Sequence, residues 1–276
     1  MWVPSENVSS KLGGSSPFIA ATYLINNFFN GVYKMKKFII SFYGILAYLI
    51  GLAGLSAFML YMGSWEFLPI HINSGIASSN TMQAIIINFL ALLLFGLHHS
   101  IAARRSFKEK LVKFMPAEIE RSTYVMKSGI FMFAICWFWQ PLVGTVWSTD
   151  NAVVVLTLQS IHIIGWLILV IATFEIDHFH LMGLKQSLSM DTLEDDKLKE
   201  GFLYKIVRHP IQTGVLMGIW STANMSMTQF MLSVCLTLYI FVGLHYEEKS
   251  LTAHFGDAYI DYKKRVPGVI PFWPTK

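Results

Sequence analysis

The chain has 276 residues, of which 54% are hydrophobic and only 14% are charged, and its formal net charge is +4. Soluble domains carry about 25% charged residues, so this composition excludes an ordinary soluble fold. The small positive charge does not indicate nucleic-acid binding, because Lys and Arg in a chain this apolar mark the cytoplasmic loops of a membrane protein.

The amino-terminal region, residues 1–34, is polar apart from a weak apolar stretch at residues 17–33. That stretch contains Asn26, Asn27 and Asn30, which are costly to place in lipid. We therefore predict that residues 1–34 form an extension that is poorly ordered or lies at the membrane interface. Residues 35–276 then form a single membrane domain.

Six apolar segments follow, and most are long enough to cross a hydrocarbon core about 30 Å thick as a helix. They predict an all-α, polytopic bundle of about six spans that ends in a helical hairpin and short cytoplasmic helices. The fifth segment is short, so it either tilts in a thinned bilayer or reaches only part of the way across. The segments are residues 38–62, 82–103, 129–147, 153–174, 210–222 and 228–246.

The distribution of basic residues predicts the orientation of this bundle. The three loops at residues 63–81, 148–152 and 223–227 contain no Lys or Arg. All basic residues fall in regions that share the opposite side if the six segments span. Because basic loops stay in the cytoplasm, we predict a multi-pass integral membrane protein with both termini cytoplasmic.

The fifth segment begins with a combination that favours anion binding. Pro210 suits the first turn of a helix, and His209 before it is kept out of helical geometry. The free N–H groups of that turn and the positive end of the helix dipole then lie beside Arg208. This helix start is a candidate site for a carboxylate or phosphate.

The hairpin should return the chain to the same membrane face and bring Glu247 and Glu248 close to Arg208 and His209. Two adjacent carboxylates at a helix end are poorly matched to the dipole there, so a cation should compensate them. Either Arg208 or a positively charged ligand could do so. A cofactor with one carboxylate and nearby cationic centres would suit both halves.

The carboxyl-terminal region, residues 197–272, resembles the isoprenylcysteine carboxyl methyltransferase and phospholipid methyltransferase superfamily. These are membrane enzymes that use S-adenosylmethionine without a Rossmann domain. The resemblance is carried by short motifs that keep their order and spacing. They are Gly201-Phe202-Leu203-Tyr204, Arg208-His209-Pro210, Glu247-Glu248-Lys249-Ser250-Leu251, Phe255-Gly256, Tyr259, Tyr262 and Val266-Pro267.

The amino-terminal half resembles the nurim/NnrU-like branch of that superfamily. The matching residues are His98-His99-Ser100-Ile101-Ala102, Pro116, Glu120-Arg121-Ser122 and Tyr124, together with the segments at 179–186 and 220–228. Within the branch, the chain is most similar to bacterial enzymes that methylate methanethiol to dimethyl sulfide. The resemblance implies S-adenosylmethionine as cofactor, a small thiol as substrate and a bacterial inner membrane as the location.

The resemblance also implies roles for individual residues. The expected cofactor-binding residues are Tyr204, Arg208, His209, Gln212, Glu247, Glu248, Tyr259 and Tyr262. The candidates for removing the thiol proton are His245, His98 and His99. Gln212 departs from the family, which often has Tyr there. His245 lies where carboxyl methyltransferases carry an Arg shortly before the glutamates, which argues against a carboxylate substrate.

The sequence is also compatible with other interpretations. The chain could be a non-enzymatic, nurim-like membrane protein, a methyltransferase acting on a lipid or a prenylcysteine carboxylate, or a haem or metal protein built on intramembrane histidines. His98 and His99 could simply make helix–helix hydrogen bonds. We expect no metal site, His178 and His180 as solvated loop residues, and Gly214 and Gly218 in close helix packing. The oligomeric state is left open.

Overall fold

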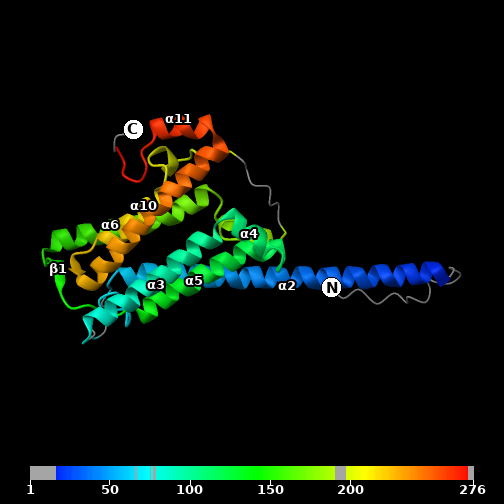
Figure 1. Cartoon of the computed structure of the whole chain (residues 1–276), viewed down its shortest axis with the longest axis horizontal. Helices are drawn as coiled ribbons and strands as arrows, with labels where there is room; N and C mark the ends of the chain where they lie inside the picture. The colour runs from blue at the N-terminus through cyan, green and yellow to red at the C-terminus, as the bar shows by residue number, and fades with distance from the viewer. Residues whose placement is uncertain (1–16, 66, 75, 77–78, 190–196, 273–276) are drawn as a thin grey trace.

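The computed structural model describes residues 17–65, 67–74, 76, 79–189 and 197–272, and five long helices dominate it (Figure 1). These helices are α2 (Pro17–Met62), α3 (Thr81–Ala102), α5 (Glu120–Phe138), α6 (Ala152–Glu175) and α10 (Met227–Phe255). The shorter elements are α4 (Arg105–Leu111), η1 (Ala117–Ile119), α7 (His178–Leu181), α8 (Leu184–Ser187), η2 (Leu203–Lys205), α9 (Pro210–Trp220) and α11 (Asp257–Arg265).

Within the described residues, four helices are long and apolar enough to cross a membrane: α2, α3, α6 and α10. This confirms a predominantly helical, multi-pass membrane protein, but the structure does not confirm six spans. Helix α5 has 19 residues and carries Glu120, Arg121 and Lys127. Helix α9 has 11 residues, and at about 1.5 Å per residue it is too short to cross alone.

The predicted third span, residues 129–147, has the wrong bounds. Helix α5 begins at Glu120 and ends at Phe138, and Pro141 and Gly144 (φ +113°) follow. Because proline lacks an N–H and Gly144 is left-handed, the helix cannot continue through them. The chain instead forms strand β1 (Thr145–Ser148), which pairs antiparallel with β2 (Asn224–Ser226). The fold is therefore mostly, not wholly, α-helical.

The first span is the end of a much longer helix. Helix α2 runs without a break from Pro17 to Met62, so the stretch at residues 17–34 is helical and continuous with the span. It projects well beyond the bundle in Figure 1. Residues 1–16 of the predicted extension lie outside the described residues. The remaining predicted spans match α3 and α6 closely, while α10 continues past Tyr246 to Phe255.

The long helices pack as two groups that share one core. Helix α5 lies along both α2 and α3, and α6 lies along α9. Between the groups, the rings of Phe58 on α2 and Trp166 on α6 meet edge to face with centroids 6.4 Å apart. Both residues belong to a buried cluster that also includes Ile219 and Leu232 from the hairpin. This cluster fixes the position of α9 and α10 in the bundle.

Glycines let α6 and α9 approach backbone to backbone. A Cβ added at Gly214 would lie 2.4 Å from the Gly165 carbonyl oxygen, and one at Gly165 would lie 2.7 Å from the Gly214 oxygen. A Cβ at Gly218 would lie 2.5 Å from the Trp166 ring. The predicted role of Gly214 and Gly218 in close helix packing is confirmed.

We expect Gly214→Ala to lower the free energy of unfolding by about 1–3 kcal/mol, because its Cβ meets backbone that cannot move aside cheaply. Thermal unfolding in detergent, followed by circular dichroism, measures the effect. Gly243→Ala on α10 is the matched control, since a Cβ there has nothing within 4 Å. Equal unfolding temperatures for the two variants would contradict this account of the α6–α9 contact.

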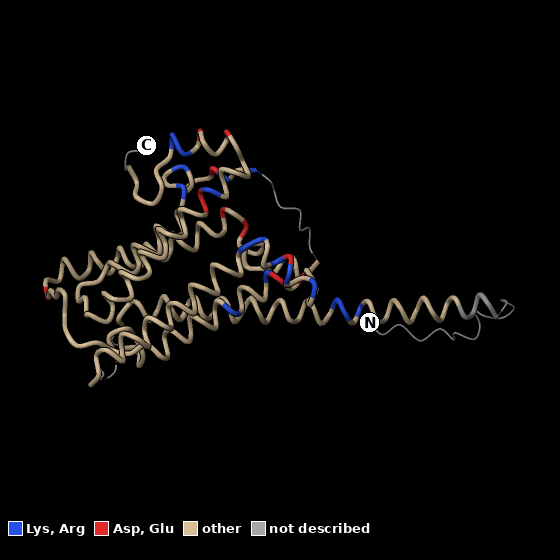
Figure 2. The backbone as a smooth tube through the Cα atoms, in the orientation of Figure 1, with Lys and Arg blue, Asp and Glu red and all other residues tan. Residues whose placement is uncertain are grey.

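Charged side chains gather at one end of the bundle. Figure 2 shows Lys, Arg, Asp and Glu concentrated around α4, the start of α5, the end of α6 and the segment from α9 to α11. At the opposite end, the described residues include Asp150 but no Lys or Arg. This separation agrees with the side assignment that the loop sequences predict.

Candidate active site

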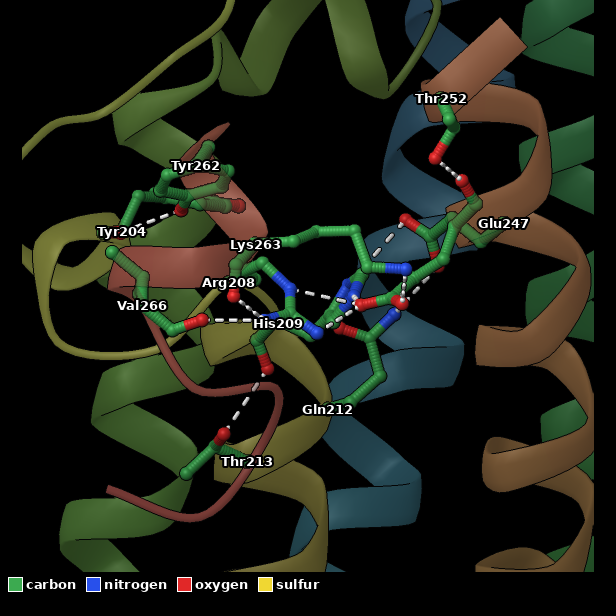
Figure 3. Close-up of polar contacts among 11 residues, drawn as sticks. Tyr204, Arg208, His209, Gln212, Thr213, Glu247, Thr252, Tyr262, Lys263 and Val266 are labelled. Carbon is green, nitrogen blue, oxygen red and sulfur yellow. Dashed lines mark hydrogen bonds and ion pairs between the residues drawn. The ribbon is translucent and has the colours of Figure 1, made fainter. Parts of the chain in front are cut away.

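The hairpin of α9 and α10 brings its two outer ends together at the charged end of the bundle (Figure 3). Arg208 precedes α9, and its Nη2 lies 2.5 Å from Glu248 Oε1 on α10. The structure therefore confirms the prediction that the hairpin brings Glu247 and Glu248 close to Arg208 and His209. One detail of the prediction was wrong: the glutamates lie inside α10, which continues to Phe255, and not at a helix end.

Glu248 is surrounded by basic groups. Besides Nη2 of Arg208, its Oε1 accepts a hydrogen bond from Arg208 Nε (2.9 Å) and contacts His209 Nε2 (3.1 Å), while its Oε2 pairs with Lys263 Nζ at 2.8 Å. The Glu248 side chain is 20% exposed and that of Arg208 is 11% exposed. Partly buried carboxylates with this many donors are held as ions.

Arg208 also binds the backbone at the end of α11 and in the segment that follows it. Its Nη1 donates to the carbonyls of Lys263 and Val266. The backbone N–H groups of Arg208 and His209 donate to the carbonyls of Pro267 (2.8 Å) and Gly268 (3.1 Å). We call the contacts of Arg208 and Glu248 with α11 and residues 266–268 the carboxyl-terminal clamp. Most donors of this guanidinium are thus engaged within the protein.

Glu247 has a different environment, although it is the next residue along α10. Its side chain is 46% exposed. Its Oε2 accepts a 3.3 Å hydrogen bond from Gln212 Nε2, and its Oε1 lies 3.9 Å from His209 Nδ1. Adjacent helical residues point about 100° apart, which separates the two carboxylates. Buried His209 lies between them and faces both.

Tyr204, Tyr259 and Tyr262 support this arrangement from the carboxyl-terminal side. Tyr259 and Tyr262 are almost fully buried and pack with Val266 as the small core under α11. The Tyr262 hydroxyl donates to the Tyr204 carbonyl at 2.5 Å. Burial raises the pKa of the half-buried Tyr204, and the carboxylates of Glu175 and Glu247 raise it further. Tyr204 is thus under the electrostatic influence of both acids, while Tyr259 and Tyr262 are packed in the core under α11.

A cavity of about 240 Å³ opens next to His209 and Glu248. Polar groups line one part of it, and the rest is apolar. His245 is among the lining residues, so one of the three candidate proton acceptors is at the cavity. The lining is His209, Phe241, Leu244, His245, Glu248, Gly268 and Val269.

His98 and His99 lie elsewhere, in the interface between α3 and α5. Ring nitrogens of His99 are 2.9 and 3.1 Å from the Tyr124 hydroxyl, and the His99 ring stacks on Phe95 with centroids 5.3 Å apart. The His98 ring lies 5.1 Å from that of Phe131. Neither histidine lines the cavity. The contacts of His99 fit the helix–helix hydrogen-bond interpretation. The Nε2 of His98 is buried and has no hydrogen-bond partner among the described residues.

His178 corrects another expectation. It is buried, and its ring contacts Thr173 Oγ1 at 2.9 Å and the Tyr48 hydroxyl at 3.1 Å. It also stacks on Phe174 with ring centroids 4.4 Å apart. The prediction of a solvated loop residue was wrong because the chain turns sharply at Asp177 (φ 90°) and folds α7 back against α2 and α6. No cluster of metal-binding side chains occurs among the described residues.

Sequence reasoning missed two residues that shape the site. Lys263 pairs with Glu248, and Glu175 accepts hydrogen bonds from the Leu203 N–H with both carboxylate oxygens, at 3.1 and 3.2 Å. A signal existed for Glu175, since a carboxylate in the last turn of a helix opposes the dipole and needs donors. For Lys263, the only signal in the sequence is its position in the amphipathic α11, next to buried Tyr262.

Comparison with known proteins places these residues in a family. A profile for phospholipid methyltransferases matches residues 144–258. The methanethiol S-methyltransferase 2 of Bradyrhizobium diazoefficiens is 38% identical over 207 residues, which cover 74% of this chain and 79% of that protein. The methanethiol S-methyltransferase of Pseudomonas deceptionensis is 37% identical, covering 74% and 79%.

More distant relatives include nurim of Xenopus laevis, which is 26% identical over 63% of this chain and 64% of its own length. No solved structure matches the chain significantly.

Proposed function

The chain belongs to the methanethiol S-methyltransferase family, and from this premise we propose that it transfers a methyl group from S-adenosylmethionine to methanethiol, giving dimethyl sulfide. It is a methyltransferase by family. The main structural support for locating this activity is the contact between the hairpin helices, which brings Glu247, His209 and Gln212 together beside a cavity.

The residues present fit S-adenosylmethionine. The Glu247 carboxylate is half exposed and its nearest partners are an amide and an imidazole, so it suits a cationic ligand. S-adenosylmethionine offers two positive groups, its ammonium and its sulfonium. Gln212 donates a hydrogen bond to this carboxylate, and the phenol of Tyr204 is a further polar group under its electrostatic influence. We assign Glu247, His209, Gln212 and Tyr204 to cofactor binding. Arg208 and Glu248 form the carboxyl-terminal clamp that supports them.

The acceptor pocket is the cavity at His245. Its volume of about 240 Å³ lies below the roughly 300–1,000 Å³ of pockets for drug-sized ligands, which favours a small thiol over a prenylcysteine. Phe241 on its apolar side is 48% exposed on a membrane-spanning helix, so an apolar thiol can arrive through the bilayer.

Bound S-adenosylmethionine supplies an electrophilic methyl group. The chain's task is then to hold the thiol sulfur in line with that methyl group and to exclude water. A thiolate is the stronger nucleophile, so the S–H proton should leave before or during the transfer. We assign proton acceptance to His245, because His209 and Glu248 in the same cavity are engaged with the clamp. The products are dimethyl sulfide, S-adenosylhomocysteine and one proton.

We further propose six membrane crossings with the charged end of the bundle in the cytoplasm of a bacterial inner membrane. In this arrangement α9 crosses part of the way and residues 221–226 complete the passage before α10 returns. The positions of β1 and β2 at the end without Lys or Arg support this path. Both termini then lie on the cytoplasmic side.

Two measurements on the purified chain in detergent test the proposal. Headspace gas chromatography should detect dimethyl sulfide only when both methanethiol and S-adenosylmethionine are supplied. Isothermal titration should show heat on addition of S-adenosylmethionine, whereas a nurim-like structural protein should show none. Dimethyl sulfide formation that needs no S-adenosylmethionine, or an absence of binding heat, would contradict the assignment.

A further inference from the structure

Glu175, the last residue of α6, makes an unusual pair of hydrogen bonds for a helix terminus. A carboxylate there faces the negative end of the helix dipole, which is unfavourable without compensation. Compensation comes from the Leu203 N–H, which donates to both carboxylate oxygens at 3.1 and 3.2 Å. The side chain therefore ties α6 to a turn 28 residues further along the chain.

Gly201 lets this tie form. A Cβ at Gly201 would lie only 3.3 Å from Glu175 Oε2, which is tighter than an ordinary contact. The same turn is closed by a 2.8 Å hydrogen bond from the Lys205 N–H to the Gly201 carbonyl. The turn at residues 201–205 is thus held on one side by Glu175.

The turn carries Tyr204, which Tyr262 holds from the other side through a hydrogen bond to the Tyr204 carbonyl. Besides burial, the carboxylates of Glu175 and Glu247 both help to raise the pKa of the Tyr204 phenol. Removing the tie frees the part of the turn that Tyr262 does not restrain.

We propose that Glu175 is a positioning residue of the methyltransferase: its carboxylate anchors the turn at residues 201–205 and so holds Tyr204 in position for cofactor binding. The inference rests on the proposed function, because it assumes that Tyr204 and Glu247 bind S-adenosylmethionine. It concerns the binding of the cofactor and not the removal of the thiol proton, which we assign to His245 in the adjoining cavity.

The test compares Glu175→Ala with Glu175→Gln by isothermal titration with S-adenosylmethionine in detergent. Glu175→Ala removes the acceptor and should raise the Kd about ten- to hundredfold, the usual effect of a lost charge-assisted hydrogen bond. Glu175→Gln keeps an acceptor oxygen for the Leu203 N–H and should recover most of the affinity. The KM for methanethiol should change little in either variant.

A double-mutant cycle with Tyr204→Ala identifies the route of the effect. If Glu175 acts through Tyr204, then Glu175→Ala should have little further effect on the Kd in the Tyr204→Ala background. Fully additive losses would overturn the proposal. So would a Glu175→Gln variant with a Kd as high as that of Glu175→Ala, because the loss of affinity would then come from the charge of Glu175 and not from its hydrogen bond to Leu203.

The controls separate this inference from the proposed function. Glu200→Gln removes an exposed ion pair with Arg265 at the edge of the same turn and should leave the Kd unchanged. If Glu175→Ala fails to fold, Gly201→Ala disturbs the same contact and should raise the Kd. A wild-type chain that binds no S-adenosylmethionine would end the proposed function, whereas normal binding by wild type, Glu175→Ala and Gly201→Ala ends only this inference.

Discussion

Glu247→Gln should weaken S-adenosylmethionine binding about ten- to hundredfold and leave the unfolding temperature unchanged. The magnitude is that of a charge-assisted hydrogen bond lost from a site that water still reaches. Stability should persist because Glu247 makes one 3.3 Å hydrogen bond and is half exposed. Isothermal titration and thermal unfolding on the same detergent preparation measure both quantities.

Glu109→Gln is the matched control, since Glu109 pairs with Arg105 on the exposed helix α4 and lies apart from the site. It should change neither binding nor stability. A Glu247→Gln protein that binds the cofactor normally would exclude Glu247 as its carboxylate ligand. A large fall in unfolding temperature would instead show that Glu247 is part of the clamp.

The sequence predicts that the hairpin ends meet, but it does not predict that Glu247 and Glu248 have different partners. The return of the chain follows from two apolar segments of known rise per residue, so Arg208 and Glu248 could be expected to meet. Which glutamate faces the arginine depends on the rotation of α10 and on its continuation to Phe255. Side-chain periodicity in an apolar helix does not reveal that rotation.

The boundaries of the spans show a similar limit. Helices α3 and α6 could be predicted to within a residue or two because Asn80 and Asn151 cap them and their apolar runs end sharply. The third span could not, because its apolar run continues past Phe138 through Trp139 into β1. Hydropathy measures compatibility with lipid, and an apolar strand or loop satisfies it as well as a helix does.

The histidines illustrate why residue type alone does not locate chemistry. His98, His99 and His245 were equal candidates by sequence, since each can titrate near neutral pH. The structure separates them by the helix interface they occupy: α3 against α5 for the first two, and the cavity beside α10 for His245. Long-range packing decided this, and no local pattern in the sequence records it.

Glu248→Ala should destabilise the protein by about 3–5 kcal/mol, the range for breaking a buried ion pair from one side. Arg208, His209 and Lys263 would lose a shared partner, and Arg208 would remain largely buried with its charge uncompensated. We expect hydrogen exchange to accelerate in α11 and residues 266–268, where the clamp holds the backbone. Enzymatic activity should fall when this clamp is lost.

The double variant Arg208→Ala with Glu248→Ala gives the sharper result. Removing both charges avoids an isolated buried ion, so the combined loss of stability should be smaller than the sum of the two single losses. Chemical denaturation of the three variants in one detergent measures the coupling. Additive losses, with unchanged exchange in α11, would mean that the Arg208–Glu248 pair is not what holds the carboxyl-terminal segment against the hairpin.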